Sequence, residues 1–208
     1  MNKKENKPHR LNDTFRLGDT GALCRGGRNF IKSYEENGDN SIKVKVLNWT
    51  DLKKYLDSQD DSILKETYID KKYYKAEQCL KKGDLVFTTF PTMAGQNVLY
   101  VSETLEDLFY NETMYIYRTT EDIDSEYIYC MLNCGIFDKV IQQYGVGYKL
   151  KLKHSMILDI ELPLYDKVTQ RKIVEEYRNI KNLEKELKER KDNYNEQLFR
   201  KIKSSILM

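Results

Sequence analysis

The sequence predicts an α+β protein: a globular domain with a mostly antiparallel β-sheet and a few helices, followed by a long C-terminal coiled-coil helix. Short apolar runs separated by turns, with no long helical pattern between them, favour antiparallel strands. From residue 169 onward, apolar residues recur at seven-residue intervals, which is typical of a coiled coil. We therefore expect a globular domain at residues 1–168 and a helix at residues 169–208.

The expected strands follow from their apolar patterns. Ser41–Asn48 alternates apolar and charged residues, which indicates a half-exposed strand. Leu85–Phe90 is apolar enough for a buried strand and is stopped by Pro91. Two further strands are expected at Asn97–Val101 and Met114–Tyr117.

Two helices are expected inside the globular domain. Trp49–Leu56 is predicted to be a short helix capped by Thr50. Ser125–Tyr144 is predicted to be a longer one, apolar over a wide arc and therefore packed on more than one side.

The C-terminal helix carries an apolar seam. Ile173, Ile180, Leu187 and Tyr194 recur every seven residues, and the stripe continues after a shift in phase. Forty helical residues span about 60 Å, far more than one small domain needs. We expect the seam to pack against a second helix through Ile173, Tyr177, Ile180, Leu183, Leu187, Tyr194, Leu198 and Ile202.

The composition narrows the class of partner. A net charge of +2 argues against a generally basic polyanion binder. The segment Gln142–Ser155 nevertheless holds Lys149, Lys151 and Lys153 with no acidic residue, which suits phosphate contacts; the alternative is a strand with a solvated face. The four cysteines show no metal-ligand spacing, and no run is apolar enough for a membrane span, so we expect no metal site, no membrane partner and a cytoplasmic location.

Familiar catalytic motifs are missing from the sequence. There is no phosphate-binding loop, dinucleotide fingerprint or nucleophile elbow, and the two histidines, His9 and His154, lie in separate regions. We therefore expect a non-catalytic protein with no cofactor of its own. The alternative is an enzyme with an unfamiliar site built from Asp84, Glu106 or Asp107.

Three stretches taken together resemble a known family. They are Arg16-Leu-Gly-Asp with Arg25-Gly-Gly, then Leu80-Lys-Lys-Gly-Asp-Leu-Val-Phe-Thr-Thr, then Gly145-Val-Gly-Tyr-Lys-Leu-Lys with Ile160-Glu-Leu-Pro-Leu and Gln170-Arg-Lys-Ile. Their order and spacing are similar to the DNA specificity (S) subunit of type I restriction–modification systems. That subunit usually resembles two such units in tandem, whereas this sequence resembles one recognition domain and one spacer helix.

The resemblance implies a function through assembly. Two half-subunits would pair antiparallel through their helices, and their two recognition domains would read a bipartite site on double-stranded DNA. Partner methyltransferase subunits would carry S-adenosylmethionine and flip the target adenine, and a restriction subunit, if present, would cut. An alternative is an anti-restriction decoy or regulator that binds methyltransferase subunits without reading DNA.

The resemblance and the strand-end positions together suggest contact residues. The candidates for phosphate binding are Arg25, Arg28, Lys149, Lys151 and Lys153. The candidates for base reading are Thr88, Thr89, Gln96, Asn97 and Tyr148.

Overall fold

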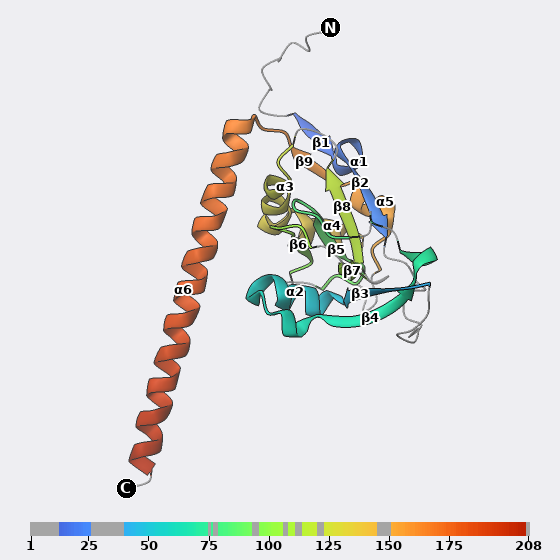
Figure 1. Cartoon of the computed structure of the whole chain (residues 1–208). Helices are drawn as coiled ribbons and strands as arrows, with labels where there is room; N and C mark the ends of the chain where they lie inside the picture. The colour runs from blue at the N-terminus through green and yellow to red at the C-terminus, as the bar shows by residue number, and fades with distance from the viewer. Residues whose placement is uncertain are drawn as a thin grey trace. The chain divides into compact units, whose positions relative to one another are not determined.

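The computed structural model describes residues 13–25, 40–74, 76, 79–92, 96–105, 108–110, 114–119, 123–144 and 151–206. The chain divides into two compact units, Met1–Lys167 and Val168–Met208. Figure 1 shows the strands and short helices of the first unit and the single long helix, α6, of the second. The predicted α+β class, with mostly antiparallel strands and a long C-terminal helix, is confirmed.

The described strands are short, as the apolar runs predict. They are β1 (Thr14–Arg16), β2 (Gly21–Arg25), β3 (Ser41–Leu47), β4 (Lys65–Asp70), β5 (Leu85–Thr88), β6 (Val98–Tyr100), β7 (Leu108–Tyr110), β8 (Met114–Thr119) and β9 (Glu161–Pro163). The helices are α1 (Leu17–Thr20), α2 (Trp49–Ser58), α3 (Ser125–Met131), α4 (Phe137–Gln143), α5 (His154–Leu158) and α6 (Lys167–Ile206). Short 3₁₀ turns occur at Asp61–Ile63 and Lys71–Tyr73.

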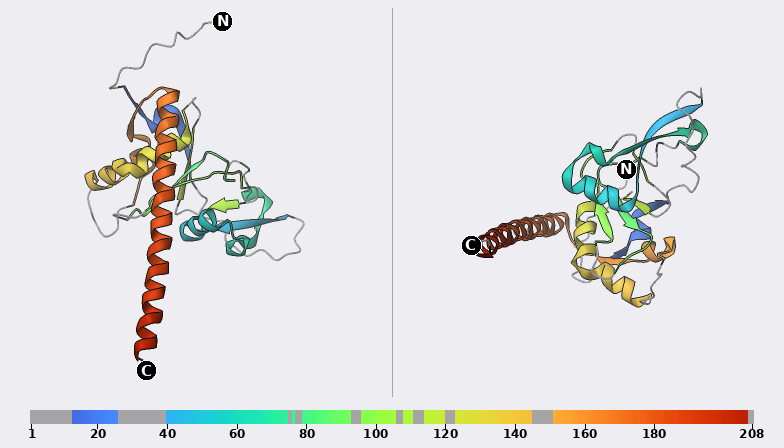
Figure 2. Two further views of the ribbon diagram at one scale, coloured as in Figure 1. Left: turned by 90° about the vertical axis from the view of Figure 1, so that its left-hand side faces the viewer. Right: turned by 90° about the horizontal axis from the view of Figure 1, so that it is seen from below.

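These strands form three sheets rather than one. The largest has the order β2-β8-β5-β6 and is antiparallel throughout. A second has the order β4-β3-β7, in which β3 and β7 run parallel, and a two-stranded sheet joins β1 to β9. Figures 1 and 2 show β3, β4 and α2 grouped together at the side of the unit away from β1 and β9.

The core lies on both faces of β5 and β8, which explains why these two strands are apolar at nearly every position. On one face, Val86 and Ile116 pack with Leu52 of α2 in a buried cluster. On the other face, the rings of Phe87 and Phe137 lie 5.6 Å apart and join β5 to α4. Each large side chain buried in this way contributes roughly 1.5–3 kcal/mol.

The opening and closing motifs of the first unit lie against each other. Strands β1 and β9 pair, with Phe15 opposite Leu162, and the Leu17 amide donates to the Ile160 carbonyl at 3.0 Å. Arg16 adds an exposed ion pair with Glu161 at 3.1 Å. The two ends of the first unit are therefore tied together, although Arg16 and Glu161 lie 145 positions apart in the sequence.

Tyr117 fixes β8 to this region from inside the core. Its hydroxyl donates to the Leu17 carbonyl at 3.0 Å and lies 2.8 Å from Thr20 Oγ1. Burial raises the pKa of Tyr117, so its neutral, hydrogen-bonding form is retained at any physiological pH. Gly21 lies against the Tyr117 ring, which a Cβ at this position would overlap. A side chain at residue 21 would therefore displace Tyr117 from its place.

The turn before β5 is built around a buried carboxylate. The Asp84 carboxylate accepts a hydrogen bond from the Lys81 amide at 2.7 Å. It also accepts hydrogen bonds from Nε and Nη2 of Arg118, each at 2.7 Å. Arg118 also donates to the Cys79 carbonyl at 3.2 Å. Gly83 has φ +90, which a residue with a side chain adopts only with strain. The Lys-Lys-Gly-Asp motif is thus a structural turn joined to β8.

Several predicted details need correction. The single helix expected at Ser125–Tyr144 is broken by a wider turn, Leu132–Ile136, because Gly135 takes φ +96. Helix α2 is capped by Asn48, whose side chain accepts from the Asp51 amide, and not by Thr50. Strand β4 was not predicted, since only Ile69 along it is fully buried.

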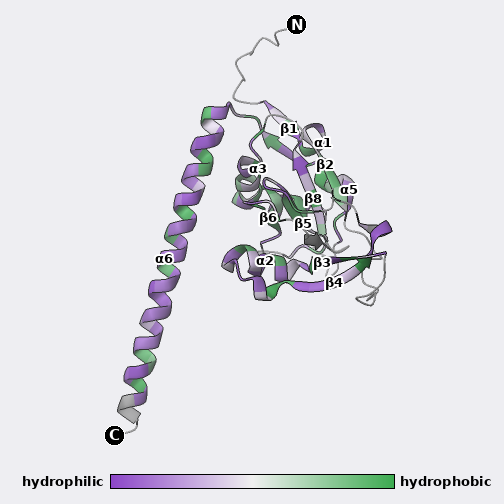
Figure 3. Cartoon of the chain, viewed as in Figure 1, coloured by the Kyte–Doolittle hydropathy of each residue, from purple (hydrophilic) through white to green (hydrophobic). Residues whose placement is uncertain are grey.

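Helix α6 is continuous from Lys167 to Ile206. Figure 3 shows apolar positions recurring along its otherwise hydrophilic length. No helix in the described part of the chain combines the length and apolar character that crossing a bilayer requires.

Replacing Arg118 with Leu should lower the free energy of unfolding by about 3 kcal/mol, because it leaves the Asp84 carboxylate buried and unpaired. The side chain of Asp84 is only 1% exposed. Arg16→Gln is the matched control, because that ion pair is more than half exposed on both sides, so solvent screens it and its loss should change the stability far less. Urea unfolding of both variants measures the difference; equal losses would contradict a structural role for the buried pair.

Candidate nucleic-acid interface

The candidate interface forms where the turn after β5 lies beside residues 151–155. The Leu152 amide donates to the Thr89 carbonyl at 2.9 Å, which joins the two segments. Leu152 itself is buried, whereas Lys151 and Lys153 on either side of it are exposed. The alternation expected for these three residues is therefore present, although they are not part of a strand.

Asn97 braces the turn from within. Its Oδ1 accepts from the Thr92 amide at 2.9 Å, and its Nδ2 donates to the Thr92 carbonyl at 2.8 Å. The Thr88 amide donates to the Asn97 carbonyl at 3.1 Å, and the Phe90 amide donates to Thr88 Oγ1 at 3.2 Å. These bonds fix the backbone from Thr88 to Thr92.

The braced turn presents Phe90 to solvent. Its ring is 51% exposed, and the Lys151 ammonium lies 5.7 Å from the ring centroid, within cation–π range. An exposed aromatic ring beside the Lys151 ammonium is able to pack on a sugar or base while the ammonium contacts a phosphate. Sequence reasoning missed Phe90 because it was assigned to the buried strand; the signal was its place directly before Pro91.

The predicted base-reading residues differ in their surroundings. Thr88, Thr89 and Asn97 are buried, and no group in the described part of the chain forms a hydrogen bond with the Thr89 hydroxyl. Gln96 is half-buried and donates to the Tyr129 hydroxyl at 3.3 Å. Arg28, Tyr148 and Lys149 lie outside the described residues, as does the side chain of Arg25, whose backbone belongs to β2.

The carboxylates of the alternative enzyme site do not form a described cluster. Asp84 is engaged by Arg118, and Glu106 and Asp107 lie outside the described residues. No group of three or more His, Cys, Asp or Glu side chains that could hold a metal ion occurs among the residues the structure describes.

The second candidate surface is the seam of α6. Ile180, Leu183 and Leu187 are 55%, 57% and 63% exposed. Tyr194, Leu198 and Ile202 continue the seam with 65%, 44% and 49% exposed, whereas Ile173 and Tyr177 are half-buried. Apolar residues exposed in a row along one helix mark an interaction surface.

Known proteins similar to this chain identify its fold. No family model and no curated protein sequence matches the chain. A chain from a structural study of complex assembly and conformational transition in the type I restriction–modification system matches with a TM-score of 0.61 and 10% identity, over 95% of this chain and 45% of its own. The HsdS subunit from Thermoanaerobacter tengcongensis matches with a TM-score of 0.56 and 14% identity, over 86% of this chain and 45% of that one.

A third match is the type I restriction–modification S subunit from M. genitalium, with a TM-score of 0.50 and 16% identity, over 84% of this chain and 41% of that one. The fold is the S-subunit fold. The chain spans less than half the length of these three matching chains, and the identities are low, so the likeness concerns the fold. The resemblance predicted from the three motifs is confirmed at that level.

Asn97→Ala should cost about 1–2 kcal/mol of unfolding free energy, because two hydrogen bonds of a buried amide are lost from the turn. Gln96→Ala is the neighbouring control and should cost less than about 1 kcal/mol, since Gln96 is half-buried and makes one long hydrogen bond. Urea unfolding monitored by circular dichroism compares the two variants. An unchanged stability for Asn97→Ala would show that the turn does not depend on this brace.

Proposed function

We propose that this protein is a sequence-specific DNA recognition subunit of a type I-like restriction–modification system, non-catalytic itself, that positions methyltransferase subunits on a bipartite site. The observation that carries the proposal is the fold shared with the HsdS subunit from Thermoanaerobacter tengcongensis over 86% of this chain. Fold alone does not assign a function, so the proposal also rests on the two surfaces that this chain exposes.

The DNA-contacting surface consists, in this proposal, of Phe90, Lys151 and Lys153, with Arg25, Arg28, Tyr148 and Lys149 as further contacts. The exposed lysines supply phosphate affinity that does not depend on sequence. Because Thr88, Thr89 and Asn97 are buried, their role in the proposal is to hold the reading turn rigid. A rigid turn lowers the entropy lost on binding and so favours discrimination between sequences.

The α6 seam is proposed to pair with the α6 of a second copy. Ile180, Leu187 and Tyr194 occupy one stripe, which a symmetric helix pair would cover. Two identical recognition units related by a two-fold axis would read a palindromic site with a central gap set by the helices. The methyltransferase subunits would supply S-adenosylmethionine and adenine flipping. A restriction subunit, if present, would cut the DNA.

Replacing Lys149, Lys151 and Lys153 with Ala should weaken binding to double-stranded DNA and flatten its salt dependence. Each lost phosphate contact should lower the slope of log K against log salt by about 0.9. Lys81→Ala with Lys82→Ala is the control, because these exposed lysines precede the opposite end of β5. The measurement is fluorescence anisotropy over a salt series with a random-sequence duplex and partner methyltransferase present.

An unchanged slope in the triple variant would remove this segment from the contact surface. Wild-type protein that binds methyltransferase but no DNA would instead favour the decoy or regulator.

Leu187→Asp should convert a dimer into monomers, because it places a charge in the centre of the apolar seam. Lys185→Asp introduces the same side chain on the opposite face of α6 and should leave the dimer intact. Light scattering coupled to gel filtration gives the mass of each variant. Dimers of undiminished stability in Leu187→Asp would show that the seam is not the contact between copies.

A further inference from the structure

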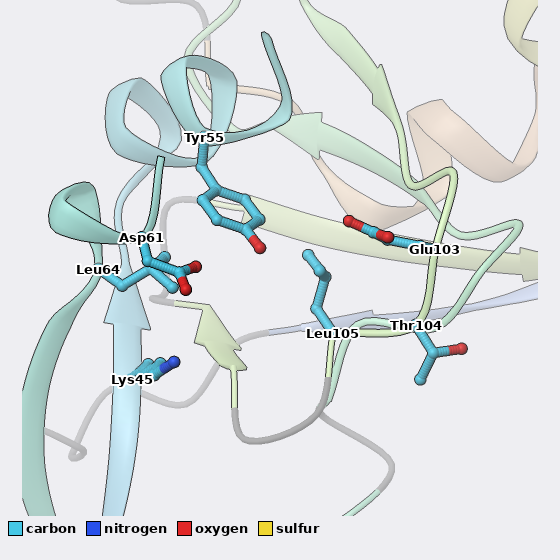
Figure 4. A pocket seen from close by; sticks show the side chains of 7 residues that line it. All are labelled: Lys45, Tyr55, Asp61, Leu64, Glu103, Thr104 and Leu105. Carbon is cyan, nitrogen blue, oxygen red and sulfur yellow. The ribbon is translucent and has the colours of Figure 1, made fainter. Parts of the chain in front are cut away.

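A small pocket lies between α2, the turn that follows it and the loop after β6, at a distance in sequence from the candidate DNA contacts. Figure 4 shows the phenol of Tyr55 directed into it, with Asp61 and Leu64 from the turn and Glu103 and Leu105 from the loop. The volume is about 260 Å³. Pockets that enclose whole small molecules are generally larger, roughly 300–1,000 Å³, so this size suits a single side chain.

The pocket is lined by polar groups that the fold leaves unused. Within the described part of the chain, neither the Asp61 nor the Glu103 carboxylate forms an ion pair or side-chain hydrogen bond. Tyr55 is only 8% exposed, and its hydroxyl has no hydrogen-bond partner among the residues that the structure describes. A buried phenol usually bonds to a partner, so this hydroxyl is free to accept from a ligand.

The electrostatic environment favours a cation. Burial first, and then the nearby charges of Asp61 and Glu103, raise the pKa of Tyr55, so the phenol stays neutral between two carboxylates. Figure 4 shows Asp61 and Glu103 approaching from opposite sides of the phenol. A planar cation between them would have donors directed at both.

Three further residues limit the shape and charge of the occupant. Leu105 is 6% exposed and, with Leu64, gives the pocket an apolar wall that suits a hydrocarbon stem. Lys45 also lines the pocket and offsets one of the two negative charges. The described lining residues therefore match a single positive charge rather than a polyamine.

We propose that this pocket binds the guanidinium of an arginine side chain presented by a partner protein, through Asp61, Glu103 and the Tyr55 hydroxyl. The guanidinium carries five donors in a planar fork, which matches two carboxylates better than a compact ammonium does. The site is separate from the proposed DNA contacts and does not depend on them. It gives the recognition unit a protein-docking point in addition to the α6 seam.

The test is an NMR titration of the full-length chain with blocked arginine, N-acetyl-arginine N-methylamide. The amides of Asp61–Leu64 and Glu103–Leu105 should shift saturably, with a Kd on the order of 1 mM, as expected for a few charge-assisted hydrogen bonds. The citrulline analogue has nearly the same shape without the charge and should bind at least tenfold more weakly. Equal binding of both probes, or no saturable shift, would overturn the proposal.

Variants assign the binding to this pocket. Asp61→Asn with Glu103→Gln should weaken blocked arginine at least tenfold, and Tyr55→Phe severalfold. Asp57→Asn, an exposed carboxylate near the end of α2 that does not line the pocket, should leave the affinity unchanged. If the double variant does not fold, the two single variants replace it; undiminished binding in both would contradict the assignment.

Free arginine distinguishes a protein side chain from a small molecule as the occupant. Its α-carboxylate gains an attraction to Lys45 that the blocked form lacks. Affinity no higher than that of blocked arginine supports docking of a side chain, whereas severalfold tighter binding would replace the proposal with a free amino-acid site. DNA binding should be the same for wild type and Asp61→Asn with Glu103→Gln, so the outcome here is separable from that of the DNA proposal.

Discussion

The pairing of Asp84 with Arg118 holds the register on which the larger sheet depends. Strands β5 and β8 pair with Leu85 opposite Tyr117, so Asp84 and Arg118 stand next to each other at the end of this ladder. A shift of β5 by one residue along β8 would exchange the two faces of β5, placing Phe87 where Val86 belongs. Because both faces are buried, the apolar pattern alone specifies this register weakly. The bidentate ion pair between Asp84 and Arg118 has a fixed geometry and therefore selects the observed register.

The same register determines where the turn at the far end of β5 begins. Once Leu85 is fixed, Thr88 lies opposite Met114 and the chain leaves the sheet at Thr89. The Asn97 brace and the Leu152 amide then hold the turn from two sides. The exposed Phe90–Lys151 pair is therefore supported by buried polar contacts on the inside. The residues predicted to read bases are polar and lie at strand ends. Of these, Thr88, Thr89 and Asn97 are buried and support the Phe90–Lys151 pair, whereas Gln96 is partly exposed.

Sequence patterns gave the class of fold and most central elements because their signals were strong. The apolar run of β5, the alternation of β3 and the heptads of α6 are each direct consequences of burial or periodicity. Strand β4 was missed because it lies at the edge of its sheet, with exposed charges such as Lys65 and Glu66.

The break at Gly135 and the inward position of Asn97 were missed for a different reason. A glycine in a helical pattern does not reveal which φ it will take, and the same asparagine suits a loop surface or a buried brace. The φ of Gly135 and the inward position of Asn97 both depend on residues that are distant in the sequence. A single sequence does not identify those residues. The pocket around Tyr55 is not predictable from the sequence for the same reason, because Asp61 and Glu103 come from separate segments.

The contact between β1 and β9 has a consequence for how this fold is assembled into larger proteins. The Leu164 amide donates to the Asp13 carbonyl at 2.8 Å, so the entry and exit of the unit are neighbours. A domain with adjacent ends behaves as a cassette: it tolerates insertion into a host chain, circular permutation or wholesale exchange without disturbing its interior. Exchange of the entire cassette would then replace the surface that this unit exposes, while the helix to which it is attached stays unchanged.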